Sequence, residues 1–161
     1  MFEIDPKGWF SRTLIIRNAG QVICAITLAR FGEKATFTLE GVKYQVYRQP
    51  STSGMFALAM GDQQLAVAEK PASAHEMKIT YGTTSYLLKR TGSLGHTCEL
   101  TINGEAVGYI KPKHGTRAAR AEIPEAVPLP IKIFIIWLYL LLWRRAASAS
   151  ASAGGADGRF S

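Results

Sequence analysis

The sequence has little cysteine and lacks the signature of an exported protein. Its two cysteines, Cys24 and Cys98, are too few for the disulfide framework of a small secreted domain. Both fall on the apolar phase of alternating segments, so we expect buried free thiols, since cysteine behaves as a small hydrophobe. The first residues carry acids where a signal peptide carries bases, and no apolar run follows them. We therefore expect a cytoplasmic protein.

Recognisable catalytic motifs are also missing. His75, His96 and His114 are too scattered to show a metal-ligand spacing, and no serine–histidine–acid arrangement can be inferred. Neither a phosphate-binding GxxxxGK[ST] loop nor a dinucleotide-binding glycine signature occurs. We therefore expect no enzymatic activity, no metal site and no cofactor.

Long hydrophobic runs are absent as well. A membrane-spanning helix needs about 20 apolar residues, and the longest run without a charge or a helix breaker has eleven, Ile133–Trp143. Extension back to Val127 reaches seventeen residues but takes in two prolines and Lys132. A small single-pass protein, anchored through a helix at about residues 127–143 and carrying a cytoplasmic β-domain, is therefore the alternative interpretation.

Short alternating segments make up most of the chain before this run. Val42–Val46, Glu76–Tyr81 and Thr97–Ile102 alternate apolar and polar residues, as half-buried strands do. We count about eleven strands from Phe10 to Ile123, with a candidate twelfth around Phe2–Ile4.

Turn glycines divide these strands at regular intervals. They recur every 20 to 22 residues, at Gly20, Gly41, Gly61, Gly82 and Gly104, and a second set of breaks lies between them. Asn103–Gly104 is the strongest turn signal, because both residues tolerate the positive φ of a type I′ hairpin. Even strand spacing with regular turns favours a sandwich or an up-and-down barrel.

The apolar run near the C-terminus decides between these folds. Wrapped as a helix it is apolar on every face, so it must be buried on all sides. A barrel of about twelve strands is wider than the eight strands whose side chains fill the interior, and a central helix fills such a barrel. We predict a mainly β fold: a closed antiparallel barrel of about 12 strands over residues 1–147, around one hydrophobic helix at about residues 130–146. The predicted core-facing residues of this helix are Phe134, Trp137, Leu138 and Leu141.

Residues 148–161 have a different character. They are rich in alanine, serine and glycine and cannot bury enough surface to offset the cost of ordering. We expect a disordered tail.

Many short strands, a hairpin such as Thr101–Ile110 and a terminal all-apolar helix together resemble the tubby-like superfamily. That superfamily includes the tubby C-terminal domain, the phospholipid scramblases and the LURP-one-related proteins. The resemblance spans about residues 2–145 and implies a twelve-stranded closed barrel around a C-terminal hydrophobic helix. It also implies a link to membrane phospholipids, because tubby domains bind phosphoinositides through basic residues.

Two scramblase features are missing from the matching positions. The resemblance implies an acidic calcium-binding segment just before the helix, but Glu122–Pro128 contains only two acids. The cysteine-rich acylation stretch is absent as well. These departures argue against scrambling activity.

The net charge of +7 favours anionic partners, and one segment concentrates it. Tyr109–Arg120 contains four basic residues and no acid: Lys111, Lys113, Arg117 and Arg120. A cationic turn of this kind can hold a phosphate headgroup, although a solvated strand edge is the competing interpretation. The segment lacks the interleaved aromatic residues of single-stranded nucleic-acid platforms, so we expect no nucleic-acid partner. We therefore expect a monomeric binding or scaffold domain, peripheral to an anionic membrane surface.

Overall fold

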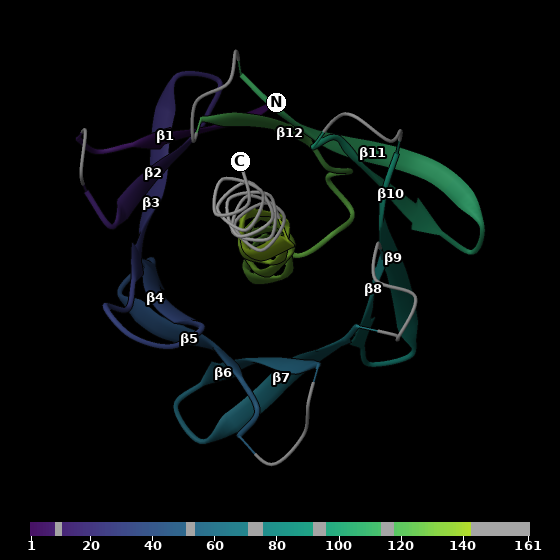
Figure 1. Cartoon of the computed structure of the whole chain (residues 1–161), viewed down its shortest axis with the longest axis horizontal. Coiled ribbons are helices and arrows are strands. Elements are labelled where there is room, and N and C mark those ends of the chain that lie inside the picture. The colour runs from purple at the N-terminus through teal and green to yellow at the C-terminus, as the bar shows by residue number, and fades with distance from the viewer. Residues whose placement is uncertain (9–10, 51–53, 71–75, 92–95, 114–117, 143–161) are drawn as a thin grey trace, which may run out of the picture.

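The computed structural model describes residues 1–8, 11–50, 54–70, 76–91, 96–113 and 118–142. They form twelve strands: β1 Phe2–Pro6, β2 Thr13–Asn18, β3 Gln21–Leu28, β4 Lys34–Leu39, β5 Val42–Arg48, β6 Met55–Met60, β7 Gln63–Glu69, β8 Glu76–Tyr81, β9 Thr84–Arg90, β10 Cys98–Ile102, β11 Glu105–Pro112 and β12 Ala119–Glu122. Each strand pairs antiparallel with its neighbour in sequence, and β1 closes the barrel by pairing with β12. Figure 1 looks along the barrel axis, with the helix in the middle.

The predicted fold class is confirmed: a closed barrel of twelve antiparallel strands surrounds one C-terminal helix. Its origin is the period of two along each strand, which sends alternate side chains to opposite faces. On β2, for example, Leu14 and Ile16 are buried inside, while Thr13, Ile15 and Arg17 are half-buried on the other phase. The candidate N-terminal strand is present as β1.

The two ends of the barrel are built differently. At one end, five two-residue turns join β2–β3, β4–β5, β6–β7, β8–β9 and β10–β11, all at the glycines expected from the sequence. We call this end the short-turn rim; the N-terminus and the connection from β12 to the helix also lie there. At the other end, connections of five to seven residues join the remaining neighbours. We call that end the long-loop rim.

The hairpin between β10 and β11 has the predicted turn geometry. Asn103 and Gly104 both have positive φ, 55° and 79°, which is the signature of a type I′ turn. The same pair of positive values recurs at Ala19–Gly20 and Glu40–Gly41. These turns match the right-handed twist of the flanking strands, so they set the register of the hairpins.

The helix covers residues 129–142 in the described part of the chain, and residues 131–141 are all buried. It starts near the short-turn rim, where the Lys132 ammonium lies 5.4 Å from the centre of the Phe2 ring. It runs toward the long-loop rim, where Trp137 meets Phe56, near the start of β6, edge to face at 5.9 Å. The four predicted core residues, Phe134, Trp137, Leu138 and Leu141, are at most 4% exposed. The enclosed position of the helix is therefore confirmed for these residues.

No helix within the described ranges is long and apolar enough to cross a membrane. The rest of the predicted helix, up to residue 146, and the tail at 148–161 lie outside the described residues.

In the described part of this interior, one buried hydroxyl lies unpaired. The hydroxyl of Tyr139 is buried and has no hydrogen-bond partner among the described residues. Burial, followed by the nearby Cys98 thiol, raises the pKa of Tyr139. An unsatisfied buried hydroxyl costs about 1–3 kcal/mol, a cost that burial of the surrounding helix surface has to offset.

We expect Trp137→Ala to lower the free energy of unfolding by about 3–5 kcal/mol, because it removes a large side chain from a packed core. Trp137 is 2% exposed and also stacks on Phe134 at 6.3 Å. Urea unfolding followed by circular dichroism measures the change. Phe31→Ala, at a side chain 78% exposed, is the control and should change stability by less than about 0.5 kcal/mol. Equal effects for the two variants would contradict an enclosed Trp137.

Gly108 allows β11 to approach β12 closely. The register between β10 and β11 shifts beside it, so that Leu100 faces Gly108 and Thr101 faces Ala106. A Cβ atom at Gly108 would collide with the backbone carbonyl of Glu122. A glycine is therefore required here by close approach of two backbones, because no flexible side chain can move aside.

We expect Gly108→Ala to destabilise the barrel by about 1–3 kcal/mol or more, as overpacking does. Gly8→Ala is the matched control, since its Cβ would lie 3.9 Å from the Ser11 Cβ, an ordinary contact. Thermal unfolding of both variants checks the difference. A Gly108→Ala protein as stable as the Gly8→Ala protein would show that β11 and β12 are not this close.

Candidate anion-binding rim

Charge is unevenly distributed along the barrel axis. On the short-turn rim, which the structure describes in full, there is no Lys or Arg in the turns, in the connection to the helix or at the strand ends. The Met1 ammonium and Lys132 of the helix do lie near this rim. The acids there are Glu40, Asp62, Glu105, Glu122 and Glu125. The described residues of the long-loop rim and its strand ends carry eight basic and three acidic side chains. The barrel is therefore electrically polar, with its positive end at the long loops.

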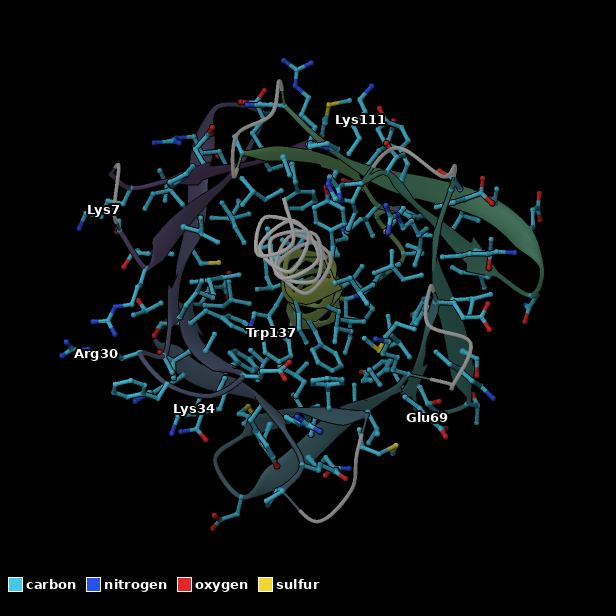
Figure 2. The ribbon with its side chains drawn as sticks, viewed as in Figure 1. Lys7, Arg30, Lys34, Glu69, Lys111 and Trp137 are labelled. Carbon is cyan, nitrogen blue, oxygen red and sulfur yellow. The ribbon has the colours of Figure 1, made fainter. Side chains whose placement is uncertain are left out.

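Four of these basic side chains lie on two adjacent loops. Lys7 and Arg12 belong to the β1–β2 loop, and Arg30 and Lys34 flank the β3–β4 loop. We call these four residues the basic rim patch. All four are exposed, and no ion pair forms at any of them within the described part of the chain. Figure 2 shows Lys7, Arg30 and Lys34 pointing outward on the same side of the barrel.

Backbone hydrogen bonds hold the two loops together. The Lys7 N–H donates to the Thr13 carbonyl at 2.9 Å, and the Leu28 N–H donates to the Arg12 carbonyl at 2.9 Å. The β3–β4 loop is closed by the Ala29 N–H, which donates to the Lys34 carbonyl at 2.9 Å. The two loops that carry these cations are therefore linked by backbone hydrogen bonds, which keep the cations on one side of the barrel.

Some of the other basic residues of the barrel are already paired with acids. Arg48 lies 3.4 Å from Glu33. On the outer face of β1, Asp5 lies 3.6 Å from Arg17. Such exposed pairs contribute little to stability, but they reduce the charge available to an external anion.

The sequence-predicted site is partly assembled. Lys111 on β11 and Arg120 on β12 are register partners, and Lys111 lies 5.2 Å from the centre of the Tyr109 ring. Lys113 pairs with Glu3 at 3.4 Å and with Asp5 at 3.6 Å, and Arg120 approaches Glu3 at 3.9 Å.

Of the four predicted cations, Lys113 and Arg120 are therefore neutralised by acids on β1, and Lys111 is exposed. Arg117 lies outside the described residues. Anion binding at this segment stays a prediction. The acids come from the opposite end of the chain, through closure of the barrel.

A hollow of about 670 Å³ lies beside the basic rim patch, over strands β3 to β6. Its polar lining comes from Thr27, Lys34, Thr36, Gln45, Tyr47 and Arg48. Lys34, with the neighbouring hydroxyl and amide groups, forms a surface that can bind phosphate and hydroxyl oxygens. Arg48 contributes less charge there, because Glu33 is already paired with it.

The two thiols are the candidate nucleophiles of the chain, and both are buried and unbridged, as expected. Burial raises the pKa of Cys24 to about 11. Burial also raises the pKa of Cys98 to about 11, although Arg90 opposes the shift. Both thiols therefore stay protonated and unreactive at neutral pH.

The histidines are candidate metal ligands or catalytic groups of the chain. His96 precedes β10, and its pKa is lowered by burial and then by Arg90. His75 and His114 lie outside the described residues. Over the described ranges, no group of three or more His, Cys, Asp or Glu side chains could hold a metal ion.

Comparison of the chain with protein-family models, with curated proteins and with solved structures finds no match.

The buried thiols predict a loss of stability at alkaline pH. The folded pKa values of about 11 exceed the ordinary value of 9.0, so the unfolded chain loses these protons first. The free energy of unfolding should therefore be unaffected by the thiols below about pH 9 and should fall as the pH rises toward 11. The expected loss is roughly 1 kcal/mol per thiol at pH 10.

Urea unfolding of the wild type and of Cys24→Ala/Cys98→Ala between pH 7 and 10 checks this expectation. In the double variant, the free energy of unfolding should fall less between pH 7 and 10 than in the wild type, by roughly 1 kcal/mol for each thiol removed. Identical slopes in the two proteins would show that the thiols are as solvated in the folded state as in the unfolded one.

Proposed function

We propose that this protein is a non-enzymatic binding domain that associates weakly with anionic phospholipid surfaces through the basic rim patch. The observation that carries the proposal is the polarity of the barrel: four exposed cations without an ion pair in the described chain gather on one side of the long-loop rim. The five acids of the short-turn rim lie at the opposite end. An anionic surface attracts the first end and repels the second.

The strength of such binding follows from the number of cations. Each Lys or Arg near an anionic leaflet contributes on the order of 1 kcal/mol, so four contribute roughly 4 kcal/mol, which corresponds to millimolar affinity. Exposed charges are screened beyond about 10 Å at 0.1 M salt. The association with the membrane is therefore weak and sensitive to salt, as expected of a peripheral protein.

Two neighbouring features support the same ligand class. The hollow over β3 to β6 places Lys34 beside the hydroxyl groups of Thr27, Thr36 and Tyr47, which suits a phosphate-bearing polyol headgroup. Arg48 also lines this hollow but is paired with Glu33. Farther round the barrel, Lys111 adds an exposed cation on β11. In this proposal Lys113 and Arg120 contribute less, because Glu3 and Asp5 already lie against them.

The resemblance to the tubby-like superfamily enters as a further part of this proposal. The closed barrel of twelve strands around a C-terminal helix is the fold that the resemblance implies. A phospholipid link and action as a monomer at the cytoplasmic face of a membrane are proposed on that basis. A fold by itself carries no function, so the charge pattern of this chain remains the primary argument.

We expect Arg30→Ala/Lys34→Ala to weaken binding to vesicles of phosphatidylcholine and phosphatidylserine by roughly thirtyfold at low salt, since two cations near the leaflet are lost. Sedimentation with vesicles at 20 mM and 300 mM salt measures the effect. The wild type should bind at the lower salt concentration and release at the higher one.

The matched control is Lys43→Ala/Lys78→Ala. It removes the same charge from two exposed lysines, one near the short-turn rim and one in the middle of β8. Its affinity should stay within a few-fold of the wild type. Indifference of the wild type to anionic vesicles at low salt, or equal losses in the two double variants, would contradict binding through the basic rim patch.

A further inference from the structure

Phe31 is the most exposed large hydrophobic side chain in the described chain, at 78%. It lies in the β3–β4 loop, between Arg30 and Lys34 of the basic rim patch. The other strongly exposed hydrophobic residues, Met1, Val22, Val42 and Tyr81, lie on or beside the short-turn rim. Within its described residues, the long-loop rim therefore presents one strongly exposed aromatic ring among cations.

The immediate surroundings of this ring are amphipathic. The Arg30 guanidinium carbon lies 5.8 Å from the centre of the Phe31 ring, a distance at which a cation and an aromatic face attract each other. Lys34 follows three residues later, and Lys7 and Arg12 lie on the adjacent loop. An aromatic ring bordered by cations partitions to the boundary between lipid headgroups and acyl chains, where the ring leaves water and the cations meet phosphates.

We propose that Phe31 is the membrane-inserting residue of this protein and that the barrel sits on an anionic bilayer by its long-loop rim, on the side of the β1–β2 and β3–β4 loops. Phe31 enters the headgroup–acyl boundary, while Arg30 and Lys34 contact lipid phosphates. The acidic short-turn rim then faces away from the lipid. This inference rests on the proposed function, to which it adds the orientation of the barrel and a contribution that salt does not screen.

Burial of the ring gives Phe31 a measurable share of the affinity. We expect Phe31→Ser to weaken binding to vesicles of phosphatidylcholine and phosphatidylserine about tenfold, with a similar ratio at low and moderate salt, because burial of apolar surface is not screened by ions. Arg30→Ala/Lys34→Ala should instead show a loss that shrinks as salt rises. Because Phe31 is exposed, its replacement should leave the fold intact.

A fluorescent label reports insertion directly. The single-cysteine change Phe31→Cys can be labelled with a nitrobenzoxadiazole dye, whose emission shifts to the blue when it leaves water. The native thiols of Cys24 and Cys98 are buried, with pKa values of about 11, so the new exposed thiol reacts first. Val22→Cys, at a position 60% exposed on the short-turn side of β3, is the matched control.

The expected result is a blue shift with anionic vesicles at position 31 and none at position 22. Wild-type protein that fails to sediment with anionic vesicles at low salt overturns the proposed function, and this inference with it. Sedimentation without a blue shift at position 31 overturns insertion alone, because binding is then purely electrostatic. A shift at position 22 overturns the orientation. A response of the label at position 31 to a single-stranded oligonucleotide, and not to vesicles, assigns the rim to nucleic acid and overturns the proposal.

Discussion

The structure depends on one mutual requirement, the burial of a mostly apolar helix inside a barrel that is too wide to fill itself. Residues 131–141 are buried on every side, and an uncovered helix of this kind is insoluble in water. The barrel in turn has twelve strands, more than the eight whose side chains can fill an interior. Each part therefore supplies the surface that the other must bury, and the two are expected to fold together.

The two ends of the barrel also differ in the space that they offer for binding. Each two-residue turn of the short-turn rim contains a glycine with positive φ, and turns this short leave little room for a binding surface. The long-loop rim has connections of five to seven residues, which carry function more often because they tolerate variation. The cations of this chain are concentrated there, so the end that is free to vary is also the end suited to an anionic partner.

Sequence reasoning located the strands and turns well, because both signals are local. Alternation with a period of two marks each half-buried strand, and the five turn glycines coincide with the five short hairpins. A second local signal was available for the rim: the breaks between the glycine turns carry Lys7, Arg12, Arg30 and Lys34. These four cations can be assigned to one end of the barrel only if one knows that alternate turns of an up-and-down barrel lie at the same end.

The candidate anion-binding site could not be predicted in the same way, because its free charge depends on ion pairs between residues that are distant in the sequence. Tyr109–Arg120 contains no acid in the sequence, yet Glu3 and Asp5 lie against Lys113 and, for Glu3, against Arg120. The cause is closure of the barrel, which pairs β1 with β12 across more than a hundred residues of chain.

By itself the sequence determined the strand count, the hairpin turns and the need to bury the helix, because these follow from periodicity, turn chemistry and hydrophobicity over a few residues. Only the tertiary structure decided which cations share a face, which of them acids neutralise, and that Phe31 is exposed at the same rim as Lys7 and Arg12. Electrostatic attraction acts through space between residues that are distant in the chain. Such ion pairs can therefore be identified only once the arrangement of the strands in the closed barrel is known.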